Sequence, residues 1–194
     1  MRLQEAKEKT RRALQDLSRF GRLERVLAAT CALTPVLLLW ADDGTGIRDS
    51  ISDYYSMGEN QLFYVPLTMA AMLFVVNGVV KDKQLYNTYL GAMLGGLLLF
   101  NNVDFTTVHF IFTAAFFVGN LAVILFFSSI KDRRFKIGLV VAIVLAMLGW
   151  KFLSWFTLFW AEWFSLAVIA FHYIIESVVD GKPAPARRVQ AQAA

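Results

Sequence analysis

Residues 105–130, FTTVHFIFTAAFFVGNLAVILFFSSI, decide the fold, because this stretch of 26 residues contains no Asp, Glu, Lys or Arg. A membrane-spanning helix needs about 20 predominantly apolar residues, so this segment is long enough to cross a bilayer. The whole chain of 194 residues is 57% hydrophobic and 18% charged, with a mean hydropathy of +0.52. This composition excludes an ordinary soluble domain and predicts an all-α, polytopic membrane protein.

Five further apolar segments lie on either side of this stretch and are separated by short polar loops. They cover residues 24–40, 61–80, 84–100, 135–153 and 156–179. With residues 105–130 they make six, and we predict a six-transmembrane-helix bundle within a membrane domain of residues 24–180.

The basic residues indicate how this bundle is oriented. If the N-terminus is inside, 17 of the 19 Lys and Arg residues fall on the inner side, and only Arg48 and Lys151 fall outside. Short loops with this bias follow the positive-inside rule, which predicts a multi-pass protein of the cell membrane with both termini cytoplasmic. The tryptophans, at positions 40, 150, 155, 160 and 163, all fall at or near the outer ends of the helices, where an interfacial belt is expected.

The two ends of the chain differ from its apolar centre. Residues 1–23 place apolar positions three or four apart, which predicts a cytoplasmic amphipathic helix on the membrane surface. Its basic side favours anionic lipid as a partner, and the alternative is a plain helical lead-in to the first span. Residues 181–194 lack apolar periodicity and are predicted to form a disordered cytoplasmic tail. The net charge of +4 describes topology, and we expect no nucleic-acid partner.

The third apolar segment contains Gly91 and Gly95 in a G-x-x-x-G pattern, beside Gly96. Small residues at this spacing let the backbone of another helix approach closely. Two interpretations remain open. The pattern is a seam for a homo-oligomer or a larger membrane complex, or it packs another helix of the same bundle.

Ionisable side chains within a bilayer are costly, so the few present here are the best indicators of a site. Asp104, His109 and Glu162 fall near the outer face, and at about 1.5 Å rise per residue His109 and Glu162 lie level with each other. We therefore expect these three to converge, with His109 contacting Glu162, in a cavity open to the outer face. Residues 41–60 form the longest loop, and its Ser52 and Asp53 are predicted to lie above that cavity. The five are our candidate catalytic residues.

A metal ion is a further option at this site, with His109, Glu162 and Asp104 as the candidate ligands. One His completed by carboxylates is a less usual set for zinc than a His-rich or Cys-rich one, and the sequence leaves the cofactor open. A second polar layer is expected nearer the cytoplasm. It contains Asn77, Asn87, Asn120, His172 and Glu176, of which the last two share one helix face at a spacing of four.

Three motifs resemble those of a family of small bacterial six-helix membrane proteins of unknown function. They are Ser50-Ile51-Ser52-Asp53-Tyr54-Tyr55, Val108-His109-Phe110 with Ala114-Ala115-Phe116-Phe117, and Phe159-Trp160-Ala161-Glu162-Trp163. The resemblance extends from about Leu38 to Lys182 and implies the six-helix fold without an established activity. Members of that family often have an acidic residue near the position of Gln61. A more distant similarity is to membrane hydrolases related to alkaline ceramidase, in which Ser, Asp and His residues form a zinc site within a helical bundle.

The sequence leaves three functions open. The first is a lipid-directed hydrolase in which Glu162 or Asp104 activates water or orients His109 as general base, while Ser52 or a metal contacts the substrate. The second is a small proton-coupled transporter that uses His109 and Glu162 as a titrating pair. The third is a non-enzymatic membrane subunit or binding protein, whose polar residues stabilise contacts between helices.

Overall fold

The computed structural model describes residues 23–42, 46–58, 60–80 and 85–180, and within them the chain is helical without a strand. The predicted helix of residues 1–23 and tail of residues 181–194 lie almost entirely outside this part. The elements are α2 (Leu23–Ala41), the 3₁₀ helix η1 (Ile51–Ser56), α3 (Gln61–Val80), α4 (Leu85–Leu99), α5 (Thr106–Ala122), the π-helical segment η2 (Val123–Phe127), α6 (Arg133–Leu153) and α7 (Leu158–Asp180). The all-helical prediction is confirmed.

Five of the described helices are long and apolar enough to cross a membrane: α2, α3, α5 together with η2, α6 and α7. The sixth predicted segment also forms a helix, but α4 has only 15 residues and is shorter than the others. At about 1.5 Å per residue it extends for about 22 Å. The length and composition of these helices are those of a membrane-embedded protein.

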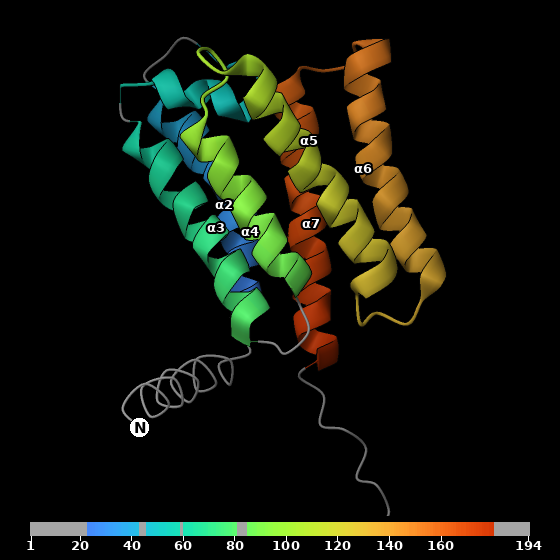
Figure 1. Cartoon of the computed structure of the whole chain (residues 1–194). Helices are drawn as coiled ribbons and strands as arrows, with labels where there is room; N and C mark the ends of the chain where they lie inside the picture. The colour runs from blue at the N-terminus through green and yellow to red at the C-terminus, as the bar shows by residue number, and fades with distance from the viewer. Residues whose placement is uncertain (1–22, 43–45, 59, 81–84, 181–194) are drawn as a thin grey trace, which may run out of the picture.

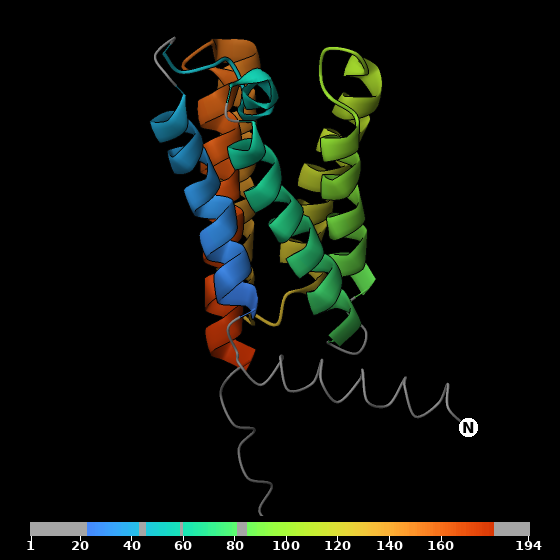
Figure 2. The same cartoon turned by 90° about the vertical axis from the view of Figure 1, so that its left-hand side faces the viewer.

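The helices form an antiparallel ring, shown from two sides in Figures 1 and 2. Around the ring, α6 packs against α7, α7 against α2, α2 against α3, α3 against α4, and α4 against α5. We call the end that holds η1 and the connection from α6 to α7 the upper end, as in Figure 1. The first residues of α2 and the last of α7 both lie at the lower end.

The ring closes between α5 and α6 through η2, which packs against α6. The backbone N–H of Ser128 donates to the carbonyl of Val123 at 2.9 Å, a spacing of five residues that defines a π turn. Val123 and Ile124, at the start of this turn, are almost completely buried. After five intervening residues α6 begins, and the Asp132 carboxylate caps it by accepting from the N–H groups of Arg134 and Phe135.

The G-x-x-x-G pattern packs within the bundle at its first glycine. A Cβ on Gly91 would lie 2.6 Å from the carbonyl oxygen of Ala71 and 2.6 Å from Cγ2 of Val75, so α3 and α4 approach closely there. A Cβ on Gly95 would meet nothing within 4 Å. The structure therefore supports the packing interpretation for Gly91, and the oligomeric alternative stays a prediction.

We predict that Gly91→Ala destabilises the fold by about 1–3 kcal/mol, the usual cost of overpacking a close contact. The added methyl group would collide with the α3 backbone, which cannot rotate away as a side chain can. Thermal unfolding of the detergent-purified protein, followed by circular dichroism, measures the loss as a midpoint several degrees lower. Gly95→Ala is the matched control and should melt at or slightly above the wild-type temperature, because alanine favours helix. Equal losses in both variants would contradict this account.

Candidate functional site

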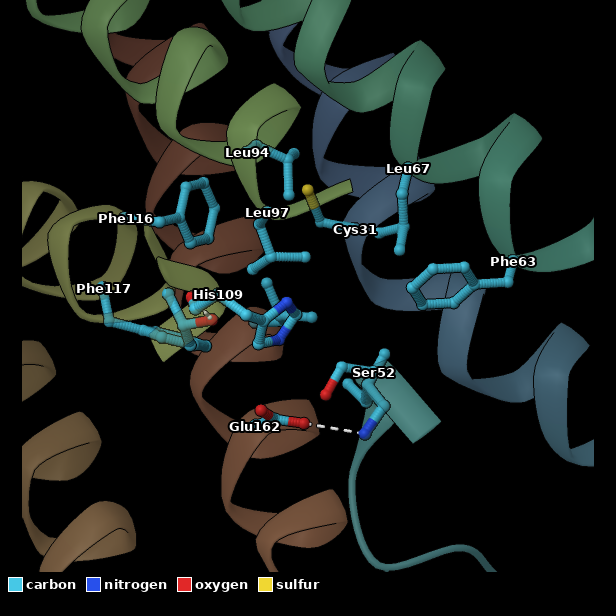
Figure 3. A pocket seen from close by; sticks show the side chains of 13 residues that line it. Cys31, Ser52, Phe63, Leu67, Leu94, Leu97, His109, Phe116, Phe117 and Glu162 are labelled. Atoms are coloured by element: carbon cyan, nitrogen blue, oxygen red, sulfur yellow. Dashed lines mark hydrogen bonds between the residues drawn. The ribbon is translucent and has the colours of Figure 1, made fainter. Parts of the chain in front are cut away.

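A cavity lies inside the ring near its upper end, and every described helix except α6 and the π segment contributes to its wall. Figure 3 shows the imidazole of His109, the hydroxyl of Ser52 and the carboxylate of Glu162 facing this space from three different elements. The rest of the wall is mainly apolar. Its members are Cys31, Ile51, Phe63, Leu67, Leu94, Leu97, Thr113, Phe116, Phe117 and Leu166.

A hydrogen bond to Glu162 holds η1 in place over the cavity. Glu162 lies on α7 and is 7% exposed, and its carboxylate Oε2 accepts a hydrogen bond from the backbone N–H of Ile51 at 2.7 Å. The N–H of Phe159, also on α7, donates to the carbonyl of Asp49 at 2.7 Å. These two hydrogen bonds hold the first turn of η1 against the upper part of α7, and they place Ser52 at the cavity.

The η1 turn is also closed by its own side chains. Ser50 Oγ accepts from the N–H of Asp53, whose carboxylate accepts from the N–H of Ser50, a reciprocal capping box. Ser50 Oγ and Ser52 Oγ share a hydrogen bond of 2.9 Å. Tyr54 is completely buried, and its ring packs against Phe159. The turn is therefore a docked lid with a fixed conformation.

Arg48 ties this lid to the end of α2. Its guanidinium donates two hydrogen bonds to the Asp42 carboxylate, at 2.8 and 3.0 Å, and one to the carbonyl of Asp53 at 3.1 Å. It also lies over the ring of Tyr54, 5.3 Å from its centre. The hydrogen bonds from Arg48 hold the pKa of Asp42 below its usual value, and those same bonds raise the pKa of Arg48.

His109 is oriented by a backbone carbonyl. Its Nδ1 lies 2.7 Å from the carbonyl oxygen of Phe100, and since a carbonyl oxygen only accepts, Nδ1 carries the hydrogen. Among the described residues Nε2 makes no hydrogen bond, and the ring faces the cavity. One turn further along α5, the hydroxyl of Thr113 donates to the carbonyl of His109 at 2.9 Å.

The expected contact between His109 and Glu162 is wrong. The two line one cavity, as predicted from their equal depth, but neither a hydrogen bond nor an ion pair joins them. The physical reason is that each has a nearer backbone partner. Glu162 accepts from the N–H of Ile51, and His109 donates to the carbonyl of Phe100.

The expected convergence of Asp104 with His109 and Glu162 is also wrong. Asp104 is exposed before the start of α5, and its carboxylate accepts from the side-chain amide of Asn101 at 2.8 Å. Asp104 precedes the N-cap residue Phe105, whose backbone is not helical, so the period of α5 does not bring Asp104 to the face of His109. Asp53 likewise caps η1 and accepts from the amide of Asn102, so it lies outside the cavity wall.

The candidate metal ligands are therefore dispersed. Within the part of the chain that the structure describes, no group of three or more His, Cys, Asp or Glu side chains is arranged to hold a metal ion. Of the candidates, only His109 and Glu162 share the cavity.

An aromatic layer forms the floor of the cavity and separates it from the second polar layer. Phe74 of α3 packs edge-to-face against Phe116 of α5 and against Tyr173 of α7, and all three are nearly inaccessible. Beyond this layer, the hydroxyl of Tyr173 donates to the Asn87 side chain at 3.0 Å. His172 Nε2 lies 3.7 Å from the Glu176 carboxylate.

One residue of the cavity wall and one contact of the lid were missed from the sequence. Thr113 lies four residues after His109, and the helical period alone would have found it. Arg48 gave no such signal, because its partners Asp42, Asp53 and Ser56 gather only when the loop folds.

We predict that Glu162→Ala releases the lid, whereas Glu162→Gln does not. Alanine leaves the buried N–H of Ile51 without an acceptor, at a cost of about 1–3 kcal/mol, while the glutamine carbonyl can still accept. Hydrogen exchange of the Ile51 amide, measured by mass spectrometry on the peptide that covers η1, should rise at least tenfold in Glu162→Ala. Unchanged exchange there would contradict the assigned role of Glu162.

Comparison with known proteins places the chain within a family. The model of a family of unknown function, DUF7103, matches residues 33–177, which include η1, all of the cavity wall except Cys31, and the aromatic floor. Neither the curated proteins nor the solved structures yielded a match. Because the match covers well over half of the 194 residues, the chain belongs to this uncharacterised family.

Proposed function

We propose that the protein crosses the cell membrane six times, with both termini and the lower end of the ring in the cytoplasm. The support is the distribution of charge over the described residues. The lower end carries Arg25, Lys131, Arg133, Arg134 and Lys136, whereas the upper end carries Arg48 and Lys151. Although α4 is short, it runs antiparallel between α3 and α5 as a full member of the ring.

Cysteine labelling tests this topology and the crossing by α4. Between residues 58 and 131 lie α3, α4 and α5 with η2. If α4 crosses the membrane, there are three crossings and the two positions lie on opposite sides. If α4 does not cross, there are two crossings and the positions lie on the same side. We expect a membrane-impermeant maleimide to label Gly58→Cys in sealed right-side-out vesicles, and Lys131→Cys only after detergent is added. Wild type is the control, because Cys31 is buried. Equal labelling of both variants in sealed vesicles would contradict six crossings.

We propose that the upper cavity binds the polar head of a lipid-like molecule. One observation carries this proposal: polar groups of Ser52, His109, Thr113 and Glu162 share the cavity with a wall of Leu, Phe and Ile side chains. The space inside it that the centres of water molecules can occupy is about 50 Å³, several times what a single water needs. That is room for a head group and not for a whole lipid.

A second candidate is the lipid-directed hydrolase, favoured by the orientation of His109. With Nδ1 held by the carbonyl of Phe100, a neutral His109 presents Nε2 to the cavity as a base. Ser52 supplies a candidate hydroxyl nucleophile at the cavity, but its hydrogen bond is to Ser50. Hydrolysis through Ser52 therefore requires that its side chain rotate from Ser50 toward His109. Proton-coupled transport has less support, because the aromatic floor of the cavity interrupts the polar path.

We predict that a bulky residue in the cavity wall abolishes lipid binding. Leu97→Trp fills the cavity, while Leu98→Trp, its neighbour on α4, points into a separate groove between α3 and α4 and serves as the matched control. Native mass spectrometry of the purified protein, with bound lipid counted per chain, should show at least a tenfold loss in Leu97→Trp alone. Both variants must keep the wild-type circular dichroism spectrum.

The hydrolase candidate is tested on the same preparations. Release of fatty acid from ester and amide lipids should disappear in His109→Ala if His109 is the base. Lipid retained by Leu97→Trp at the wild-type level would refute binding in the cavity, and hydrolysis that survives in His109→Ala would refute the hydrolytic mechanism.

A further inference from the structure

The hydrogen-bonding groups at the upper cavity are mainly acceptors. In a neutral His109 the Nδ1–H is used on the carbonyl of Phe100, which leaves Nε2 as an acceptor. The hydroxyl hydrogen of Thr113 is used on the carbonyl of His109, so its oxygen can only accept from a ligand. Glu162 uses Oε2 on the N–H of Ile51, and Oε1 remains. With Glu162 ionised, Ser52 is the one of these four side chains that can supply a hydrogen, because either serine oxygen can be the donor in its bond with Ser50.

The charged side chains at the cavity also favour a ligand that donates hydrogen bonds and carries positive charge. No Lys or Arg is among the described residues of its wall, whereas Glu162 does line it and is buried, with 7% of the residue exposed. The nearest guanidinium on the lid, that of Arg48, is already bonded to Asp42, Asp53 and Ser56. Buried carboxylates are normally paired with a cation, and among the described residues Glu162 has only a peptide N–H as its hydrogen-bond donor.

The surroundings of the cavity add to this bias. The upper end of the ring carries Asp42, Asp49, Asp53 and Asp104 against the basic residues Arg48 and Lys151. An excess of carboxylates around a low-dielectric cleft raises the local concentration of cations and lowers that of anions. A phosphate or carboxylate head group would be repelled by these carboxylates and would find almost no hydrogen-bond donor inside the cavity.

We infer that the ligand of the upper cavity is a long-chain primary amine, bound as its ammonium ion. This inference rests on the proposed function and names its ligand class. The ammonium supplies three N–H donors, which match the acceptors His109 Nε2, Thr113 Oγ1 and Glu162 Oε1, and it provides the positive charge that the Glu162 carboxylate lacks. The first methylene groups of the alkyl chain would contact the apolar wall, beside Leu97 and Phe117, and the rest of the chain would extend out of the cavity.

The test uses four probes that share one dodecyl chain and differ only in the head: dodecylamine, dodecanol, laurate and dodecyl phosphate. Each competes at pH 7 against a fluorescent alkyl probe bound to the full chain in nanodiscs of neutral phosphatidylcholine. Leu97→Trp, measured in parallel, corrects for partitioning into the lipid. We expect dodecylamine to displace the probe at a concentration at least tenfold below those of laurate and dodecyl phosphate, with dodecanol between them. Glu162→Gln should remove most of the advantage of the amine over the alcohol.

The outcomes separate this inference from the proposed function. Laurate or dodecyl phosphate as effective as the amine would overturn the ligand class and leave lipid binding intact. Dodecanol equal to dodecylamine, or an undiminished amine advantage in Glu162→Gln, would overturn the assignment of an ammonium to Glu162. A probe that binds wild type and Leu97→Trp alike, with no competitor effective, would overturn the proposed function itself.

Discussion

The hydrogen bond from the backbone N–H of Ile51 to the carboxylate of Glu162 is the interaction on which the upper half of the molecule depends. It joins the loop after the first long helix to the last helix, 111 residues away in sequence. A carboxylate in an apolar helix is expensive unless a donor satisfies it, and a buried N–H at the start of a 3₁₀ turn needs an acceptor. Each group satisfies the other, so the lid and α7 are fixed relative to one another.

The need of buried polar groups for hydrogen-bond partners also explains the contacts of the other polar side chains in the ring. Some return to their own helix: the hydroxyl of Thr34 donates to the carbonyl of Thr30, and the amide of Asn120 donates to the carbonyl of Phe116. These bonds need no partner helix, and neither Thr34 nor Asn120 lines the upper cavity. His109 and Glu162 differ, since each uses one polar atom on backbone and leaves another at the cavity. A polar atom that faces the cavity distinguishes His109 and Glu162 from polar side chains that only satisfy the backbone of their own helix.

The aromatic floor limits what the site can do. Phe74, Phe116 and Tyr173 come from three different helices, meet in edge-to-face contacts and are almost completely buried. A molecule that enters from the upper end therefore meets a closed end. This geometry favours binding, or chemistry on a bound head group, over passage through the ring.

The sequence by itself determined the helices and the depth of the polar residues. Five of the described helices follow from apolar runs long enough to span a bilayer, and the equal depth of His109 and Glu162 follows from a constant rise per residue. Only the tertiary structure decided the partners. A period of 3.6 gives the face of a residue relative to its own helix, but not the rotation of that helix in the ring. Asp104 therefore lies outside, and Glu162 bonds to Ile51 in place of His109. The same holds for His109, whose partner Phe100 offers a backbone carbonyl, a group that every residue carries and that no sequence pattern marks.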